Sequence, residues 1–418
     1  MTRFNKYLTL SFVVGASLLC QRVPSAVSSP PISQRTPVAT LLRTFELPSV
    51  PDSFYLVFAS AMQVIFASGN NSLSTFDIQT GKIHLVRDGD QPLKGAKKIV
   101  RDEFIQALQL TPHDQFLMIV YGDGIIHLYD VKTGKERMLR GVHSSSYKAG
   151  SRSGMEDIAV SPDGQRIIAA GHSLEMWDLK AGKHVVFQKS GGRLGQLSFS
   201  PDGTRFAVAQ AIETEEDNVF RIARVSVRNA ATGRIEWKDA LPFADRVIYE
   251  DDLPDQFSFA RDGRTLVGII DSVAYFWDGK DGKSRGQLHF GSDAIFSSAK
   301  LSRDGKLLAL NANRGQDSRV RLYDTGTRTV RWVTPVYKQS QSQVVGFSSN
   351  NSLLITSTFT DENKTGKRPT TDGTRCWDTR TGHLIQTLPD ESAEVLSSDG
   401  KLLLTTNYEG VKKLWQIR

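Results

Sequence analysis

The sequence predicts an all-β fold built from a repeated unit of four antiparallel strands, because two kinds of turn recur at regular distances along its 418 residues. The first turn has the pattern S-P-D-G or a close variant, in which proline presets the turn and glycine supplies the positive φ that closes a hairpin. Its copies begin at Ser161, Ser200, Ala260, Ser302 and Ser397, with weaker copies at Thr111 and Ser348.

The second turn follows the pattern D-x-x-T-G. Its eight copies have Asp, or the residue in its place, at Asp77, Asp130, Asp178, Asn229, Asp278, Asp324, Asp378 and Gln416. Successive copies lie 53, 48, 51, 49, 46, 54 and 38 residues apart. Between the turns, runs such as QRIIAAG and SLEMWD show the alternation and composition of strands. Four-stranded repeats of about 40 to 50 residues are typical of a β-propeller, whose blades bury their faces against neighbouring blades.

The best preserved copies identify the residues that we expect to shape the turns. These are Pro162, Asp163, Gly164, Asp178, Gly182, Pro201, Asp202, Gly203, Asp278, Gly282, Asp378 and Gly382. Trp177 stands beside one of these turns, and we expect it to pack between blades.

We expect eight four-stranded blades, closed by an N-terminal strand that completes the last blade. The last copy stops at Arg418, at the end of its third strand, and TLLRTFELP at 40–48 resembles HLIQTLP at 383–389, the fourth strand of the preceding copy. Such a seal removes sheet edges that would otherwise template aggregation. A seven-bladed ring is the alternative, because the first copy, at 49–86, lacks the S-P-D-G turn.

SPDGQRIIAAG, LEMWDLKAGK, SPDGTRFAVA and DGKLLLTTNYEGVKKLW resemble blades of the WD-repeat (WD40-like) propellers. The resemblance covers residues 39–418, and is closest to divergent, bacterial-type secreted members. It implies a rigid platform for other proteins. The Gly-His pair that often opens a WD repeat is absent from that position, so the His, Ser, Asp and Trp network that braces blades in the family cannot be carried over.

The basic excess of the chain lies at its N-terminus. The net charge is +7, but the first forty residues hold four basic residues and no acidic ones, which leaves 48 basic against 45 acidic. A nearly neutral body has no electrostatic footprint for nucleic acid. The apolar run YLTLSFVVGASLLC after Arg3 and Lys6 predicts a signal peptide at 1–28, then a linker at 29–38 and a single propeller at 39–418. We therefore expect an exported protein, periplasmic or secreted.

Two other interpretations of this N-terminus stay open. An uncleaved anchor is disfavoured because about fourteen apolar residues fall short of the ~20 that span a bilayer. Lipid attachment at Cys20 is disfavoured because Leu19 stands where bacterial lipoprotein signals carry a small residue. After cleavage only Cys376 would remain, so no intramolecular disulfide is expected.

The turns of a propeller fall on two opposite rims, and here only one rim varies in length. It carries the connections at 87–103, 141–155 and 241–254 and the insertions at 211–221 and 361–372. Loops on a rigid scaffold concentrate recognition residues. We expect an unidentified protein partner to bind there, at an acidic patch suited to a basic surface; solvated loops without a partner are the alternative. The candidate residues are Glu213, Glu215, Glu216, Asp217, Glu250, Asp251 and Asp252, with Glu156 and Arg193.

A propeller enzyme acting on a small molecule in the central channel, quinoprotein dehydrogenase-like or lactonase-like, is the alternative from another class. The chain has no G-x-S-x-G motif, and Ser161 belongs to a repeating turn. NAATGRIEW at 229–237 follows the D-x-x-T-G-x-x-x-W repeat of quinone-dependent dehydrogenases, but the adjacent cysteine pair typical of many of them is absent. We therefore predict a protein with no catalytic residue, metal or cofactor. We also predict that it is a monomer, that it does not bind nucleic acid, and that its mature chain has no membrane span.

Overall fold

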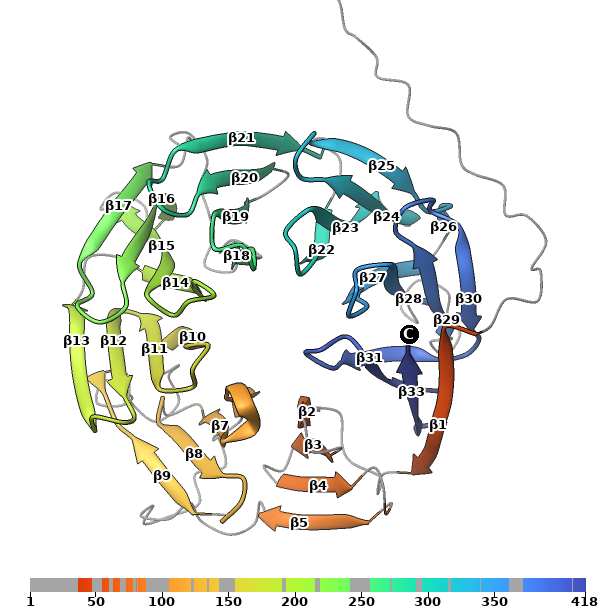
Figure 1. Cartoon of the computed structure of the whole chain (residues 1–418), viewed down its shortest axis with the longest axis horizontal. Coiled ribbons are helices and arrows are strands. Elements are labelled where there is room, and N and C mark those ends of the chain that lie inside the picture. Colours follow the sequence, from red (N-terminus) through yellow and green to blue (C-terminus); the bar gives the residue numbers. More distant parts are fainter. Residues whose placement is uncertain are drawn as a thin grey trace, which may run out of the picture.

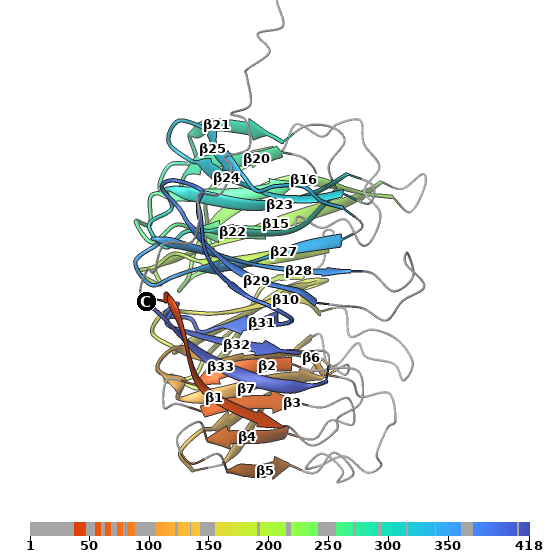
Figure 2. The ribbon, with the colours of Figure 1, turned by 90° about the vertical axis from the view of Figure 1, so that its right-hand side faces the viewer.

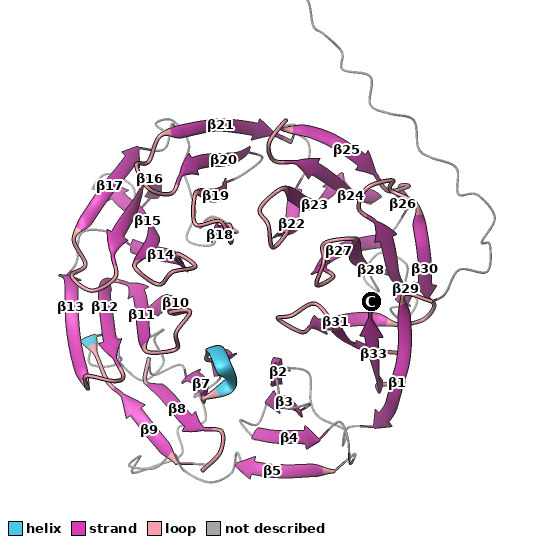
Figure 3. Ribbon diagram, in the orientation of Figure 1, coloured by secondary structure: helices cyan, strands magenta, loops and turns pink. Residues whose placement is uncertain are grey.

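The computed structural model describes the chain in segments. These are residues 37–46, 55–59, 63–67, 73–77, 80, 82–87, 105–121, 124–133, 135–142, 155–189, 193–214, 219–240, 256–270, 273–290, 295–314, 317–338, 340–360, 371–407 and 409–418. Strands account for most of them, and helical stretches are short (Figure 3). The fold is therefore all-β, as predicted.

The described strands form eight antiparallel sheets, seven of four strands and one of five, arranged around a central axis (Figure 1). Sheet 1 contains β2 (Tyr55–Ala59), β3 (Gln63–Ala67), β4 (Leu73–Asp77) and β5 (Ile83–Arg87). Sheet 2 contains β6 (Ile105–Leu110), β7 (Phe116–Tyr121), β8 (Ile126–Asp130) and β9 (Glu136–Leu139), with the short 3₁₀ helix η1 (Pro112–Asp114) after β6. Sheet 3 contains β10 (Met155–Val160), β11 (Arg166–Gly171), β12 (Ser173–Asp178) and β13 (Lys183–Lys189). Sheet 4 contains β14 (Arg193–Phe199), β15 (Arg205–Thr214), β16 (Val219–Asn229) and β17 (Ile235–Ala240).

The remaining sheets continue around the axis in chain order. Sheet 5 contains β18 (Gln256–Phe259), β19 (Thr265–Ile270), β20 (Val273–Asp278) and β21 (Ser284–His289). Sheet 6 contains β22 (Ile295–Leu301), β23 (Leu307–Arg314), β24 (Asp317–Asp324), β25 (Thr329–Val333) and β26 (Tyr337–Lys338), which pairs with β24. Sheet 7 contains β27 (Ser340–Phe347), β28 (Leu353–Thr360), β29 (Thr371–Asp378) and β30 (Leu384–Leu388). Sheet 8 contains β31 (Ser392–Leu396), β32 (Leu402–Thr406), β33 (Val411–Ile417) and β1 (Ala39–Glu46).

Sheet 8 combines strands from both ends of the described chain. Strand β1 pairs antiparallel with β33, with Ala39 opposite Ile417 at one end of the ladder. The side chain of Gln386, from sheet 7, accepts the N–H groups of Val38 and Ala39, both at 2.9 Å, and donates to the Ala39 carbonyl at 2.9 Å. The strand from the N-terminal region is therefore held by two sheets at once.

The S-P-D-G turns close with one repeated set of hydrogen bonds. At the best preserved copy, the Gly164 N–H donates to the Ser161 carbonyl at 2.8 Å and the Ser161 hydroxyl donates to Asp163 Oδ1 at 2.5 Å. Gly164 has a φ of 70°, and in the weaker copies Asp114 and Asn351 adopt φ of 51° and 59°. The closing hydrogen bond of the turn is kept in these copies, from Asp114 to Thr111 and from Asn351 to Ser348, where glycine is absent.

Serine and backbone donors also set the charge state of the turn aspartates. Burial by itself would raise the pKa of Asp163, but the hydrogen bonds from Ser161 and the Gln165 N–H outweigh it, so the pKa lies below its usual value. The same balance, with Ser200 and Thr204 as donors, lowers the pKa of Asp202. These carboxylates stay charged at neutral pH while being occupied by their own turns.

The hydrophobic core lies between neighbouring sheets. Trp177 of sheet 3 is buried in a cluster with Met118 and Leu128 of sheet 2, as expected for a residue that packs between blades. Cys376 is buried in the cluster that sheets 7 and 8 form, and burial raises the pKa of its thiol to about 12. A thiol in that state is protonated and unreactive.

Sheet 8 has a hydrogen-bonded brace of its own composition. The Trp415 indole N–H donates to Thr405 Oγ1 at 2.9 Å, and the Thr405 hydroxyl donates to Glu391 Oε2 at 2.5 Å. The other oxygen of Glu391 accepts from Lys413 Nζ at 2.5 Å. The brace of sheet 8 therefore consists of a tryptophan, a threonine, a glutamate and a lysine.

Candidate functional site at the variable rim

The two edges of the ring differ in how far their strands reach. The uniform rim is the edge that carries the S-P-D-G and D-x-x-T-G turns, and the variable rim is the opposite edge. Strands β15 and β16 have 10 and 11 residues, whereas β11 and β12 in the preceding sheet have six each. They extend beyond their neighbours toward the variable rim (Figure 2).

Much of the predicted insertion at 211–221 is regular strand. After a bulge between Gln210 and Ala211, β15 and β16 stay paired until Thr214 lies opposite Val219. Strand β14 reaches only as far as the pair of Arg193 with Ala211, so the hairpin continues beyond the sheet as two strands. The loop that the sequence suggested is therefore mostly a paired hairpin. We call residues 211–214 of β15 and 219–222 of β16 the β-arm.

The structure describes part of the nominated acidic patch. The backbone of Glu213 lies in the β-arm opposite Phe220, and Arg193 begins β14 two register positions away. Glu156 lies in the bulge of β10 between Met155 and Asp157, in the preceding sheet. The other nominated residues, Glu215, Glu216, Asp217, Glu250, Asp251 and Asp252, lie outside the described residues.

Asp157, which sequence reasoning missed, ties sheets 3 and 4 together beside these positions. Its Oδ1 accepts the Ile158 N–H at 2.7 Å, and its Oδ2 accepts the Leu197 N–H from the bulge of β14. Gln196, in that bulge, has a positive φ of 56°. Burial raises the pKa of Asp157 to about 6 despite these two hydrogen bonds. Both oxygens are occupied by the backbone, so the residue positions β14.

We expect Asp157→Asn to remove one component of the pH dependence of stability. Because the pKa is raised on folding, the native protein binds a proton between about pH 4 and 6 that the unfolded chain releases, so this component of stability falls as pH rises through that window. The component amounts to at most about 3 kcal/mol. Urea unfolding at pH 4.5 and 7.5 measures it as the difference between the two proteins, which cancels the opposite slope of the turn aspartates. If both proteins showed the same change in stability between these two pH values, the raised pKa of Asp157 would be contradicted.

A second buried carboxylate holds the start of the 141–155 connection. Glu175 on β12 has no exposed surface and accepts the Val142 N–H at 2.9 Å and the Ser173 hydroxyl at 2.8 Å. His184 Nε2 lies 2.7 Å from the same carboxylate, and its ring stacks on Trp177 at 4.8 Å. This connection therefore leaves sheet 2 from a fixed point on the variable rim.

Sheet 2 has the same pair with the partners exchanged. There His127 lies on the third strand and Glu136 on the fourth, with His127 Nδ1 2.6 Å from Glu136 Oε1. In each pair, the two residues are nine positions apart in the sequence. Counted from the residue just before the turn aspartate, the first member lies two positions earlier and the second lies seven positions later. Aligning the copies at that position would have pointed to both pairs.

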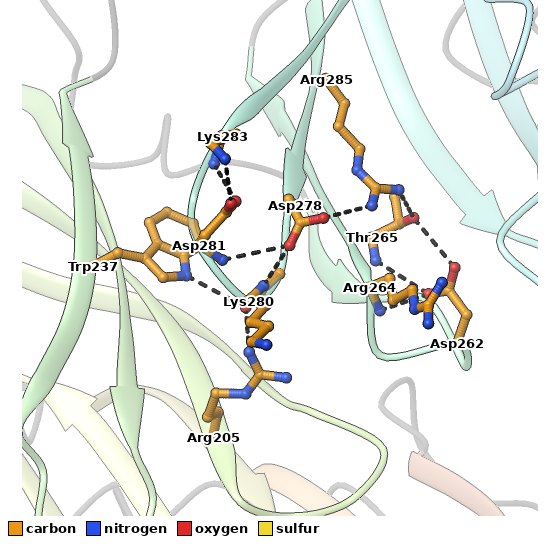
Figure 4. A network of polar contacts seen from close by, with 11 residues as sticks. Arg205, Trp237, Asp262, Arg264, Thr265, Asp278, Lys280, Asp281, Lys283 and Arg285 are labelled. Carbon is orange, nitrogen blue, oxygen red and sulfur yellow. Dashed lines mark hydrogen bonds and ion pairs between the residues drawn. The ribbon is translucent and has the colours of Figure 1, made fainter.

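Aromatic residues join neighbouring sheets along the uniform rim. The Trp237 indole lies against Gly282 in the next sheet, where an added Cβ would stand 2.6 Å from the ring. The Gly279 carbonyl accepts from Trp237 Nε1 at 3.3 Å and from Arg205 Nη1 at 2.6 Å (Figure 4). Beside it, Asp278 Oδ1 accepts the Lys280 N–H at 2.9 Å. The predicted turn residues Asp278 and Gly282 thus shape a seam between sheets.

The same position is filled differently in other sheets. Phe187 packs over Gly233, and Trp332 packs over Gly382 and donates to the Thr379 carbonyl at 3.0 Å. Between sheets 5 and 6 the roles are exchanged. Gly286 stands at the aromatic position, and Arg328, with a φ of 59°, stands at the glycine position and fills the space. Each seam is therefore matched to its own pair of sheets.

Ser161 and His172 lie at opposite edges of sheet 3. Ser161 Oγ is used within its turn on the uniform rim, whereas His172 lies at the opposite end of β11, between β11 and β12. In the part of the chain that the structure describes, no cluster of three or more His, Cys, Asp or Glu could hold a metal ion. None of the described helices has the length and apolar character to cross a membrane.

Comparison with known proteins identifies the fold. The family profile of the anaphase-promoting complex subunit 4 WD40 domain matches residues 68–151. The computationally designed Ika8 protein superposes with a TM-score of 0.60 and 17% identity over 89% of this chain and 98% of its own. A chain of the mitotic checkpoint complex superposes with a TM-score of 0.54 and 12% identity over 94% and 99%. No curated protein sequence matches. Since 1579 chains of solved structures match, the propeller fold alone identifies no partner.

Proposed function

We propose that the eight sheets are the blades of one closed ring, and that the protein is an exported, non-enzymatic platform that binds another protein through its variable rim. WD40 propellers commonly act as scaffolds for protein interaction, which supports the general class. The export, the ring closure and the acidic docking patch are parts of the proposal. The partner is a protein with a basic surface.

The β-arm of β15 and β16 is the observation that carries this proposal. It projects from one rim only, and it places Glu213 on a two-stranded arm whose base is held by pairing with β14. Asp157 fixes β14, and Glu175 fixes the neighbouring connection. A projecting hairpin on a held base suits recognition, and the acidic residues of its sequence suit a basic partner.

Reversing the charge of the arm is expected to abolish the partner's capture. The variant replaces Glu213, Glu215, Glu216 and Asp217 by lysine, and proximity labelling of the exported full-length protein, with mass spectrometry, measures recovery of its most enriched neighbour. A control variant replaces Lys132, Lys135, Lys180 and Lys183, exposed on the uniform rim, by glutamate. Loss in the first variant with retention in the second supports the proposal. Equal recovery from both, or a tightly bound cofactor in native mass spectra, would overturn it.

Export predicts removal of the first residues. N-terminal sequencing of the protein purified from the periplasm or medium is expected to start near residue 29, after the small residues of QRVPSAVSS. A mature chain that begins at Met1 or Thr2 would refute the signal peptide. The same experiment on a Cys20→Ser variant separates cleavage from lipid attachment, because only a lipoprotein requires that cysteine.

A further inference from the structure

The uniform rim is unevenly charged. The equivalent positions in each sheet are of three kinds. They are the five residues that start at the first position of the S-P-D-G turn, the six that start at the aspartate of the D-x-x-T-G turn, and the residue two positions after those six. Sheets 5 and 6 each carry a net charge of +2 at these positions, and every other sheet with both turns lies between −1 and +1. The basic residues of sheets 5 and 6 are Arg261, Arg264, Lys280, Lys283, Arg285, Arg303, Lys306, Arg328 and Arg331, against Asp262, Asp278, Asp281, Asp304 and Asp324.

The carboxylates of this sector are occupied by their own turns. Asp262 Oδ1 accepts the N–H groups of Arg264 and Thr265 at 2.8 and 3.1 Å (Figure 4). Asp278 Oδ2 accepts from Arg285 at 2.6 Å. Asp324 in sheet 6 repeats this arrangement, since its Oδ2 accepts from the guanidinium of Arg331 at 2.7 Å. These carboxylates are therefore already hydrogen-bonded within their own sheets.

Four basic side chains of the sector are exposed and uncommitted. Within the described residues, Arg261, Arg264, Lys280 and Lys306 make no side-chain hydrogen bond or ion pair. Arg303 stands between sheets, donates to the Ser398 carbonyl, and has its pKa lowered by burial and by the nearby Arg261 guanidinium. Like charges are thus held near one another across two adjacent sheets.

We propose that this basic sector, formed by Arg261, Arg264, Lys280 and Lys306, binds an acidic segment of a protein. Separate cationic groups alternate here with aspartates, a pattern that suits spaced carboxylates better than a continuous phosphate backbone. Trp237 of sheet 4, which borders the sector, is packed on Gly282, so it is not a free stacking platform for bases. The exposed large apolar side chains of the described residues lie elsewhere, at Leu41, Leu42, Val185, Ile235 and Val336, so the sector offers nothing to insert into a lipid surface.

The surface lies on the rim opposite the β-arm, so it is independent of the proposed function. One propeller could then hold a basic partner on its variable rim and an acidic one on its uniform rim. Failure of the arm variant above would leave this surface untouched, and failure here would leave the arm untouched.

The test measures binding of a fluorescein-labelled deca-glutamate peptide to the full-length protein by anisotropy at 20 and 150 mM NaCl. Reversal of Arg261, Arg264, Lys280 and Lys306 to glutamate is expected to weaken binding by about tenfold or more. The matched control reverses Lys132, Lys135, Lys180 and Lys183 in sheets 2 and 3, which changes the net charge by the same amount. We expect the control to keep its affinity within about threefold.

Three results would overturn the proposal. They are no measurable binding to the unmodified protein, an equal loss in both variants, or tighter binding of duplex DNA or of phosphatidylglycerol vesicles than of the peptide. Melting temperatures of both variants, compared with that of the unmodified protein, exclude unfolding as the cause of a loss. If the variant of sheets 5 and 6 is unfolded, Lys280→Glu with Lys306→Glu gives the decision, with Lys132→Glu and Lys180→Glu as its control.

Discussion

Replacing Glu175 by alanine is expected to lower the free energy of unfolding by about 3 to 5 kcal/mol, among the largest effects of any single substitution in this chain. The carboxylate is wholly buried, and it satisfies the Val142 N–H and the Ser173 hydroxyl. Removing it breaks the hydrogen bonds from both donors, takes away the carboxylate beside His184 Nε2 and leaves a cavity between sheets 2 and 3. Urea unfolding of the full chain, followed by tryptophan fluorescence, measures the change.

Glu236 provides the control, because it is exposed and, from the residues that the structure describes, accepts only a long hydrogen bond of 3.4 Å, from Asn229. Glu236→Ala is expected to change stability by less than about 0.5 kcal/mol. Glu175→Gln keeps the volume and one acceptor oxygen, so its effect should fall between the two. If Glu175→Ala were as mild as the control, the carboxylate would not be holding the connection.

Gly233→Ala is expected to destabilise the protein by about 3 kcal/mol or more, whereas Gly182→Ala should cost about 1 to 2 kcal/mol. The two glycines occupy the same turn position in adjacent sheets, with φ of 69° and 65°. A methyl group on Gly182 meets nothing within 4 Å, but on Gly233 it overlaps the Phe187 ring. The difference between the variants therefore isolates the packing of Phe187 from backbone strain.

A double-mutant cycle tests that assignment. With Phe187 already replaced by alanine, the added methyl group of Gly233→Ala no longer meets the ring and meets only the Cβ of residue 187, at 2.9 Å, so its further cost should fall toward that of Gly182→Ala. Thermal unfolding of the four proteins measures the coupling. An unchanged cost of Gly233→Ala in the Phe187→Ala background would mean that strain alone explains the effect.

The turns could be predicted because their geometry depends on neighbouring residues only. Proline, aspartate and glycine within four positions determine the bonds of the Ser161 turn, and the weaker copy at Thr111 keeps the hydrogen bond from Asp114 to Thr111 at 3.0 Å. The strands follow from the turns, since period-two alternation between two fixed points leaves little choice of register. The all-β, repeated architecture was therefore accessible from the sequence.

The tertiary contacts could not be predicted in this way. Asp157 finds the Leu197 N–H forty residues away, and only because a bulge in β14 turns that N–H toward it. The β-arm was mistaken for a loop because its acidic composition resembles a solvated insertion, whereas cross-strand pairing with Val219 to Ile222 decides its structure.

Arg228 shows the same limit at a single position. It occupies the place of the aromatic residue before the turn in sheet 4, is 5% exposed, and donates from Nη2 to Gln188 Oε1 at 2.7 Å. Burial lowers its pKa. The sequence alone suggests that an arginine at this position is exposed to solvent, because the neutral partner that accompanies its burial lies in another sheet.

The exchange of Gly286 and Arg328 bears on how such a chain can evolve. Tandem repeats are prone to gain or lose copies by recombination between similar segments. Losing sheet 5 here would bring the Trp237 indole against the Arg328 side chain, where it now meets the empty surface of Gly282. The guanidinium, which now fills the space over Gly286, would have to move to admit the ring. Because the side chains are matched pair by pair across the seams, a chain that lost or exchanged a copy would pack poorly at the new seam. The matching therefore disfavours changes in the number and order of the copies.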